Sequence, residues 1–320
     1  MNNSLWLVVP CYNEKLVIVN TADALLKLIV DLCSEDIISH ESKIVFVDDG
    51  SSDGTWEEIE KLCVTSSKIV GIKLSHNQGH QNALLAGMMY AKDKCDCVIT
   101  IDADLQDDIY AIPEFIKKYQ EGCHIVYGVR RKRETDTVFK RTTAHMFYRF
   151  MNAMGVETVY NHADYRLLSN KALNALENYK ETNLFLRGIV PLMGFKSDSV
   201  FYDRKARTAG ETKYPLKKML NFAFDGITSF SMKPLRVISF IGMLSSLLSL
   251  LGLVYALVSH FCGVTVPGWT AIVCSIWLLG GIQLLSIGVL GEYIGKIFSE
   301  VKQRPRYFID EIVANDEYEK

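Results

Sequence analysis

The stretch from Val237 to Gly291 contains no Asp, Glu, Lys or Arg, and it limits what this chain can fold into more than any other feature. A helix that crosses a lipid bilayer needs about 20 mainly apolar residues, so this stretch is too long for one crossing and suits two. A break falls at residues 259–263, and Pro267-Gly268 follows it. We therefore expect two transmembrane helices, at 235–259 and 269–294. Two buried helices of a soluble core are the alternative.

Basic residues flank this stretch on both sides, whereas the turn between the two expected helices contains none. They are Lys233, Arg236, Lys296, Lys302, Arg304 and Arg306. Because cytoplasmic loops carry an excess of Lys and Arg, we expect a multi-pass protein of the cell (inner) membrane, with both termini and the large N-terminal region in the cytoplasm. Residues 213–234 mix apolar and charged side chains and are expected to form a juxtamembrane amphipathic segment.

The region before residue 213 alternates between strand and helix patterns. Strands are expected at 5–9, 43–47, 69–74, 98–101 and 125–127, and helices at 15–33, from about 56, at 81–91 and at 113–119. This alternation is typical of βαβ units. The expected fold class is therefore α/β with a mostly parallel sheet.

The fourth expected strand, 98–101, ends in the pair Asp102 and Asp104. Carboxylates are unfavourable inside a sheet, so we expect them at its carboxyl edge, where α/β proteins bind ligands. Two carboxylates that flank one small residue can face the same divalent cation. Their oxygens suit Mg²⁺ or Mn²⁺ and leave coordination positions for phosphate. An acidic surface turn is the alternative.

Asp48, Asp49 and Asp53 follow the second expected strand and share this edge. Asp53 is suited to cap the next helix, whereas Asp49 can accept hydrogen bonds from a base or a ribose. The sequence has no G-x-G-x-x-G after its first strand and no Walker A loop, which are the two commonest phosphate cradles. A nucleotide diphosphate would therefore depend on a metal ion.

Basic residues follow the fifth expected strand and recur before the apolar region. They are Arg130, Arg133, Lys140 and Arg141, and then Arg207 and Lys213 in a basic, glycine-containing loop at 204–214. Clusters of this kind can bind a second phosphate, with bidentate contacts where arginine is used. A solvated surface loop is the alternative.

Some polar residues have two interpretations. Asp164 and Arg166 either form a buried ion pair or present a carboxylate to the reacting centre, and Arg187 similarly lies in an apolar run. His76 and His80 are spaced like zinc ligands on a helix, but the H-E-x-x-H pattern is absent. We expect these histidines to be loop residues at the start of the third helix.

Composition excludes several classes of protein. The formal net charge of −2 argues against a nucleic-acid-binding protein, which usually carries a basic surplus. The 8 cysteines are scattered and are expected to be reduced residues of a cytosolic domain. No basic region or cleavage site precedes the first strand, so we expect no signal peptide. The polar, acidic tail after Arg306 is expected to be loose.

Five motifs occur in order along the chain. They are Pro10-x-Tyr12-Asn13-Glu14, Val47-Asp48-Asp49-Gly50-Ser51-x-Asp53-Gly54-Thr55, Asp102-Ala103-Asp104-Leu105-Gln106-Asp107, Asp164-x-Arg166-Leu167-Leu168 and Arg207-x-x-Gly210-Glu211-x-Lys213. Together they resemble the family 2 glycosyltransferases of the polyprenyl-phosphate type, which have a Rossmann-like GT-A fold. The chain is similar to dolichol-phosphate mannose synthases and, more closely, to bacterial undecaprenyl-phosphate glucosyltransferases with a two-helix membrane hairpin. The Gln-x-x-Arg-Trp motif of processive synthases is absent, which favours transfer of a single sugar.

The resemblance implies roles for individual residues. Pro10, Tyr12, Glu14, Val47 and Asp49 would line the base and ribose pocket, and Asp102, Ala103 and Asp104 would hold the metal and diphosphate, with Gln106 completing the metal shell. We expect Asp104, Asp164 and Arg187 to act in catalysis. Phosphate contacts are expected from Arg130, Arg133, Lys140, Arg141, Arg207 and Lys213.

These expectations describe an inverting, metal-dependent enzyme that transfers one hexose, with glucose from UDP-glucose as first choice, to polyprenyl phosphate for cell-envelope glycosylation. UDP-GlcNAc, UDP-galactose and GDP-mannose are alternative donors, and a neutral lipid is an alternative acceptor. A membrane-anchored nucleotide-sugar-binding scaffold is the non-enzymatic alternative. Glycines in the apolar region would allow a homo-oligomer.

The expected organisation has four parts. Residues 1–212 form the cytoplasmic GT-A domain, 213–234 the amphipathic segment, 235–297 the two transmembrane helices and 298–320 a cytoplasmic tail.

Overall fold

The computed structural model describes residues 3–130, 162–181, 185–203 and 268–315, together with parts of a helix between 235 and 251. The chain divides into two compact units. The first comprises residues 1–145, 158–213 and 303–320, and the second comprises residues 146–157 and 214–302. The candidate site lies entirely in the first unit.

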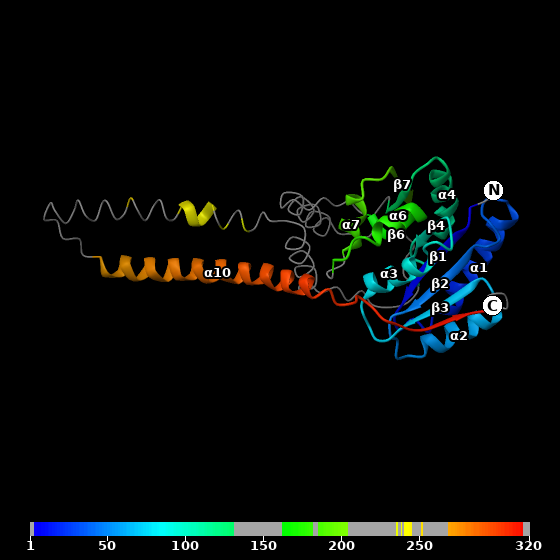
Figure 1. The fold of residues 1–320 in the computed structure, drawn as a ribbon, viewed down its shortest axis with the longest axis horizontal. Helices are drawn as coiled ribbons and strands as arrows, with labels where there is room; N and C mark the ends of the chain where they lie inside the picture. Colours follow the sequence, from blue (N-terminus) through cyan, green and yellow to red (C-terminus); the bar gives the residue numbers. More distant parts are fainter. Residues whose placement is uncertain are drawn as a thin grey trace. The chain divides into compact units, whose positions relative to one another are not determined.

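The first unit is built on one eight-stranded sheet, in the order β7-β5-β6-β4-β1-β2-β3-β8 (Figure 1). The strands are β1 Leu5–Cys11, β2 Lys43–Asp48, β3 Ile69–Leu74, β4 Cys97–Thr100, β5 Ile125–Arg130, β6 His162–Ser169, β7 Ser197–Tyr202 and β8 Ile309–Ala314. β6 and β8 run antiparallel to their neighbours, and the other pairs are parallel. The predicted α/β class with a mostly parallel sheet is confirmed.

Helices cover both faces of the sheet. The helices of this unit are α1 Ile18–Ser34, α2 Thr55–Thr65, α3 His80–Ala91, the 3-10 turn η1 Ile109–Ala111, α4 Ile112–Gln120, α6 Asn170–Leu176 and α7 Leu186–Leu192. α1, α2 and α4 share one core with alternate residues of β1, such as Leu5 and Leu7. α3 lies on the opposite face, where a Cβ at Gly87 would come within 2.5 Å of the Val8 side chain. Burial on both faces explains why these strands read as continuous apolar runs.

The strands and helices predicted for the first 130 residues are present, with shifted ends. The expected strand at 69–74 coincides with β3, whereas β5 continues beyond the expected 125–127 to Arg130. β6 was not predicted, because Asp164 and Arg166 interrupt its apolar pattern.

The expectation of a loose tail after Arg306 is wrong for β8. β8 pairs antiparallel with β3, from Val70 opposite Ala314 to Leu74 opposite Ile309. The Ser75 backbone N–H also donates to the Phe308 carbonyl at 3.0 Å. The apolar residues Ile309, Ile312 and Val313 favour this strand once a partner edge is available.

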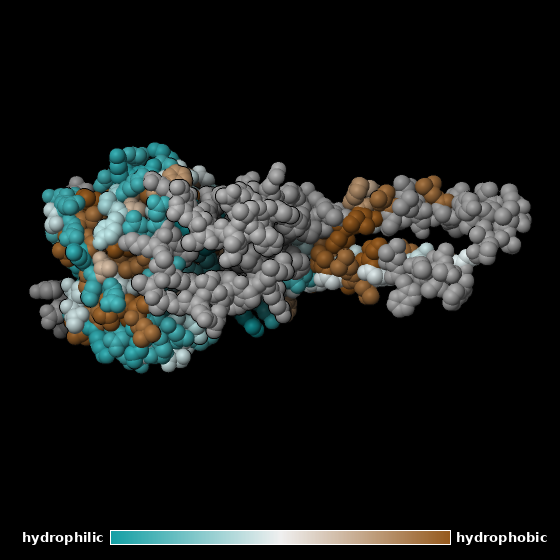
Figure 2. Space-filling view, turned by 180° about the vertical axis from the view of Figure 1, so that it is seen from behind, coloured by the Kyte–Doolittle hydropathy of each residue, from teal (hydrophilic) through white to brown (hydrophobic). Residues whose placement is uncertain are grey.

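The described part of the second unit is dominated by α10, Trp269–Lys302, a helix of 34 residues. The expected helix at 269–294 is therefore confirmed as a helix and continues further. Its segment Leu279–Lys302 is long and apolar enough to cross a membrane, by length and composition alone. Large apolar side chains are exposed along it, including Leu284 at 73% and Leu285 at 68% (Figure 2). Most of the other expected transmembrane helix, 235–259, lies outside the described residues.

Candidate active site

The pair Asp102 and Asp104 lies in a loop at the carboxyl edge of the sheet, directly after β4. Thr21 of α1 holds this loop by donating its hydroxyl to the Ala103 carbonyl at 2.6 Å. Gln106 donates its backbone N–H to Asp104 Oδ1 at 3.2 Å and its side-chain amide to Asp104 Oδ2 at 2.6 Å. These contacts fix the loop backbone at Ala103 and the carboxylate of Asp104.

The far end of this loop is fixed by side chains from three strands. The buried carboxylate of Asp107 accepts hydrogen bonds from Tyr202 of β7 at 2.8 Å and from Arg130 of β5 at 3.1 Å. Tyr165 of β6 donates its hydroxyl to the Asp108 carbonyl at 3.1 Å. Arg130, predicted to bind phosphate, is thus placed against Asp107 in the described structure.

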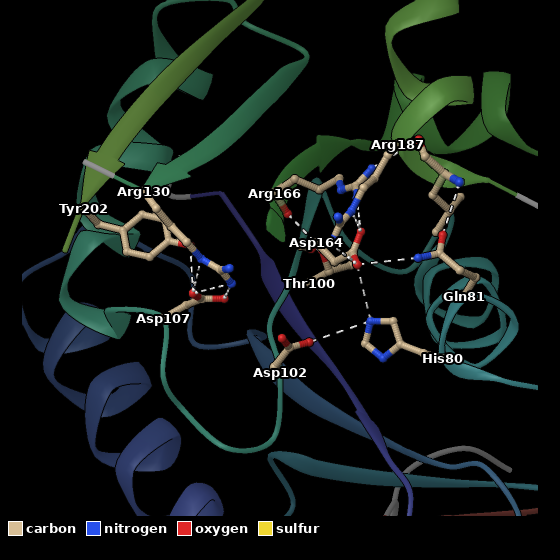
Figure 3. A network of polar contacts seen from close by, with 11 residues as sticks. His80, Gln81, Thr100, Asp102, Asp107, Arg130, Asp164, Arg166, Arg187 and Tyr202 are labelled. Atoms are coloured by element: carbon tan, nitrogen blue, oxygen red, sulfur yellow. Dashed lines mark hydrogen bonds and ion pairs between the residues drawn. The ribbon is translucent and has the colours of Figure 1, made fainter. Parts of the chain in front are cut away.

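A second polar cluster surrounds Asp164, which β6 brings beside the same loop (Figure 3). Arg166 donates to Asp164 Oδ1. Arg187, at the start of α7, donates through Nε to Oδ1 at 3.2 Å and through a terminal nitrogen to Oδ2 at 3.0 Å. Gln81 of α3 donates to Oδ2 at 3.4 Å and accepts the Leu186 backbone N–H at 3.1 Å. β6, α3 and α7 therefore meet at one carboxylate.

His80 connects this cluster with the aspartate pair. Its Nε2 lies 3.7 Å from Asp102 Oδ1 and 3.6 Å from Asp164 Oδ2, as Figure 3 shows. His80 is the first residue of α3. The two predicted catalytic carboxylate regions are thus joined by one imidazole.

The carboxylates of Asp164 and Asp102 differ in proton affinity because their electrostatic surroundings differ. Burial alone would raise the pKa of Asp164, but His80 and the charges of Arg187 and Arg166 hold that pKa well below its usual range. Asp164 is therefore ionised at any physiological pH and has little affinity for a substrate proton.

Asp102 has the opposite environment. Burial raises its pKa to about 6, and the charges of Asp107, Asp164 and Asp104 add to this effect, while His80 opposes it. The ionised form of Asp102 is therefore less stable than that of an ordinary carboxylate, and a cation bound nearby would stabilise it. Its side chain is 37% exposed, so such a cation can reach it.

The carboxylates at this sheet edge are candidate ligands of a divalent metal. Within the part of the chain that the structure describes, no group of three or more His, Cys, Asp or Glu side chains is arranged to hold a metal ion. Mg²⁺, however, is usually bound by one or two carboxylates together with substrate phosphates and water. Asp102 and Asp104 supply two carboxylates, and the charges of Asp107 and Asp164 also act on Asp102. The donor set therefore fits Mg²⁺ or Mn²⁺ bound jointly with a diphosphate.

The predicted nucleotide-binding residues lie at the neighbouring strand ends. Asp49 follows β2 and accepts the backbone N–H groups of Gln78 at 2.7 Å and Gly79 at 2.9 Å. Gly50 has φ +69°, and a Cβ there would approach the His76 and Asn77 backbone to 2.7 Å. Only glycine fits at position 50, where the loop after β2 packs against the loop after β3.

The residues expected to line the base and ribose pocket differ in accessibility. Pro10 and Val47 are paired across β1 and β2 and are buried. Tyr12 is half exposed, and Glu14 donates its backbone N–H to Thr55 Oγ1 at 2.9 Å. Of these four residues, Tyr12 is the best placed to meet a ligand. Their roles, like that of Asp49, stay predictions.

Several predicted site residues cannot be placed. Arg133, Lys140, Arg141, Arg207 and Lys213 lie outside the described residues. Their predicted contacts with phosphate therefore stay predictions.

Sequence reasoning missed three members of the site. His80 and Gln81 were assigned to the start of a helix, and Tyr202 was not singled out. The helix start after β3 shares the sheet edge with Asp102, and this placement was the available signal for His80 and Gln81. Tyr202 has no local signal, because it meets Asp107 only through the pairing of β7 with β5.

Comparison with known proteins places this geometry in context. Residues 6–177 match the family described as glycosyl transferase family 2. The uncharacterized glycosyltransferase YkoT of Bacillus subtilis (strain 168) is 55% identical over 313 residues, which are 98% of this chain and 93% of that protein.

Two relatives carry more specific names. The prophage bactoprenol glucosyl transferase homolog of Escherichia coli (strain K12) is 39% identical over 308 residues, covering 96% of this chain and 98% of that protein. The bactoprenol glucosyl transferase of Shigella phage SfII is 39% identical over 305 residues, covering 95% of this chain and 96% of that protein.

Proposed function

The chain belongs to glycosyl transferase family 2 and is a glycosyltransferase, and from this premise we propose that it transfers one hexose, glucose from UDP-glucose, to a polyprenyl phosphate with inversion at the anomeric carbon. The observation that carries the proposal is the extent of the likeness to proteins named bactoprenol glucosyl transferases. It covers 95–96% of this chain, including the apolar region as well as the site.

The site geometry supports specific roles. Asp102 and Asp104 would hold Mg²⁺ or Mn²⁺, with Gln106 beside them, and the cation would neutralise charge on the departing diphosphate. Pro10, Tyr12, Glu14, Val47, Asp49 and Ala103 contribute to the donor nucleotide site. The sequence pattern, and not the geometry, assigns further phosphate contacts to Arg133, Lys140, Arg141, Arg207 and Lys213. Arg130 borders the loop at residues 102–107.

The acceptor chemistry fits the state of Asp164. A phosphate monoester has a second pKa of about 6, so its oxygen is already anionic at neutral pH. Such a nucleophile needs no base, and an Asp164 with a strongly lowered pKa is a poor base. A hydroxyl of a neutral lipid would need a base, which makes this alternative acceptor less suited to the site.

The sheet topology supports a membrane hairpin. β7 ends at Tyr202 and β8 begins at Ile309, and both belong to one sheet. If α10 crosses the bilayer, the chain between these strands must cross an even number of times, because both strands lie on the same side. A second crossing at 235–259 satisfies this condition. The proposed location is therefore the cell membrane, with the catalytic domain and both termini cytoplasmic.

An acceptor comparison tests the proposed function. Purified full-length protein with Mg²⁺ receives labelled UDP-glucose and either undecaprenyl phosphate or diacylglycerol in the same detergent. We expect label to enter undecaprenyl phosphate alone, and the Asp104→Asn variant to lose this transfer. The exposed cation Lys61 serves as control, because its ion pair with Glu58 lies on the surface and contributes little; Lys61→Gln should match wild type. Transfer to diacylglycerol alone would contradict the proposal.

A further inference from the structure

Both oxygens of Asp164 are occupied by donors. Oδ1 accepts from Arg166 and from Arg187 Nε, and Oδ2 accepts from the terminal nitrogen of Arg187 and from Gln81. A carboxylate offers about four acceptor positions, and these four hydrogen bonds account for them, while His80 Nε2 lies 3.6 Å from Oδ2. The geometry of Asp164 is therefore that of a group that fixes donors in place.

Arg187 is the more accessible of the two arginines on Asp164. Its side chain is 34% exposed, compared with 2% for Arg166. Its two contacts with Asp164 set the plane of the guanidinium. Its backbone is also anchored, because Gln81 accepts the N–H of the preceding residue, Leu186, at 3.1 Å. The guanidinium is thus held in a fixed orientation and can still be reached from solvent.

This fixed cation is linked through Asp164 and His80 to Asp102, the carboxylate that is proposed to hold the metal. His80 contacts Asp164 on one side and Asp102 on the other (Figure 3). A phosphate nucleophile must approach a donor that already carries a diphosphate, and the two anions repel each other. A cation placed beside the reacting carbon offsets this repulsion, and a guanidinium binds phosphate oxygens with defined geometry.

Arg130 has a different environment. Its guanidinium lies against the buried Asp107 and beside the Tyr202 hydroxyl, and its side chain is 18% exposed. Arg130 stabilises the end of the loop at residues 102–107. Figure 3 shows it in a group separate from the Asp164 cluster. Of these two described arginines, Arg187 is therefore the better placed to meet a substrate.

We propose that Arg187 binds the phosphate of the acceptor and that Asp164 fixes its guanidinium for this purpose; the inference rests on the proposed function. An acceptor oxygen bound there attacks the anomeric carbon and forms the new C–O bond. The bond from that carbon to the nucleoside diphosphate breaks, and the diphosphate leaves with the electron pair. No proton is transferred in this step.

Arg187→Gln and Arg187→Lys in the full-length protein test the inference, with Lys61→Gln as control. Two quantities are measured: the KM for undecaprenyl phosphate in detergent, and the Kd for UDP with Mg²⁺ by calorimetry. We expect Arg187→Gln to raise the acceptor KM by roughly tenfold or more, since a hydrogen bond to a charged group contributes about 1.5–3 kcal/mol. The Kd for UDP should stay within about twofold of wild type, because the inference places Arg187 at the acceptor and not at the donor.

The lysine variant guards against a folding defect. Lysine keeps the charge and loses the planar fork, so Arg187→Lys should fold, keep UDP affinity and show an intermediate acceptor KM. Weaker UDP binding with an unchanged acceptor KM, in either variant, would overturn the inference and assign Arg187 to the donor diphosphate. Absence of transfer by wild type would instead contradict the proposed function itself.

Discussion

At the scale of single residues, the site is defined by the contrast between Asp102 and Asp164. Both are carboxylates at one sheet edge, and both touch His80. Two arginines compensate the charge of Asp164, whereas Asp102 faces other carboxylates. Asp164 is therefore suited to a permanent structural charge, and Asp102 to a charge that a bound cation balances.

The raised pKa of Asp102 predicts a pH-dependent response to Mg²⁺. Its folded-state pKa of about 6 exceeds the model-compound value of 3.8, so the folded protein holds this proton more tightly than the unfolded chain does. Without metal, the contribution of Asp102 to stability is therefore present at low pH and lost as the pH rises through about 6. Mg²⁺ binds the ionised carboxylate, so its increase in Tm should be large at neutral pH and small below the pKa.

Thermal unfolding with and without Mg²⁺, at neutral pH and at a pH below the pKa of Asp102, measures this effect. Asp102→Asn removes the titrating group and serves as control; it should lose most of the Mg²⁺ response at neutral pH. An equal Mg²⁺-induced shift at both pH values in wild type would contradict the assignment.

Asp164→Asn is predicted to lower both stability and turnover. The substitution leaves the buried Arg166 without its compensating charge, and breaking a buried ion pair in this way costs about 3–5 kcal/mol. Turnover should fall because Arg187 loses the carboxylate that orients it. Urea unfolding and transfer rates measure the two effects. A variant with wild-type stability and no turnover would favour a base role for Asp164.

The residues of the site could be predicted only in part from the sequence. Asp102 and Asp104 were found because carboxylates after an apolar strand are visible in the local pattern. The function of His80 was missed because its contacts with Asp102 and Asp164 join three separate elements. The compensation of Asp164 by Arg187 depends in the same way on where α7 begins.

At the scale of elements, the antiparallel strands β6 and β8 and the parallel edge strand β7 were missed. β6 carries charged residues whose partners come from other elements, so its sequence does not resemble a buried strand. β8 pairs with β3, which is far from it in the sequence. The buried parallel strands β1 to β4 were predicted because their apolar runs need no knowledge of a partner.

β8 links the last described residues to the loop that is proposed to bind the donor. The Phe308 carbonyl accepts the Ser75 N–H at 3.0 Å, at the start of the loop whose Gln78 and Gly79 N–H groups hold Asp49. Removal of residues 308–320 should lower the unfolding free energy by roughly 2–4 kcal/mol, since each backbone hydrogen bond contributes about 1 kcal/mol. It should also weaken UDP binding severalfold.

A shorter truncation is the matched control for β8. Removal of residues 316–320 leaves β8 intact and should preserve both stability and UDP affinity. Urea unfolding and calorimetry compare the three proteins. Equal UDP affinity in all three would contradict the link between β8 and the donor site.

At the scale of the whole molecule, the proposed reaction requires a water-soluble donor to meet an acceptor confined to the bilayer. The α/β unit presents the site at one sheet edge, and α10 supplies an apolar surface suited to lipid. Return of the chain to the sheet through β8 is compatible with a hairpin that leaves both termini on one side. Together these features suit an enzyme of the membrane surface.

The most direct measurement is a donor panel on membranes that contain the full-length protein. Labelled UDP-glucose, UDP-GlcNAc, UDP-galactose and GDP-mannose are each supplied with undecaprenyl phosphate, with and without Mg²⁺ or Mn²⁺. We predict metal-dependent label in the lipid fraction from UDP-glucose, and none with Asp104→Asn. Label from one of the other donors would correct the sugar and keep the reaction. No transfer from any donor, with Asp104→Asn indistinguishable from wild type, would contradict glycosyl transfer to polyprenyl phosphate.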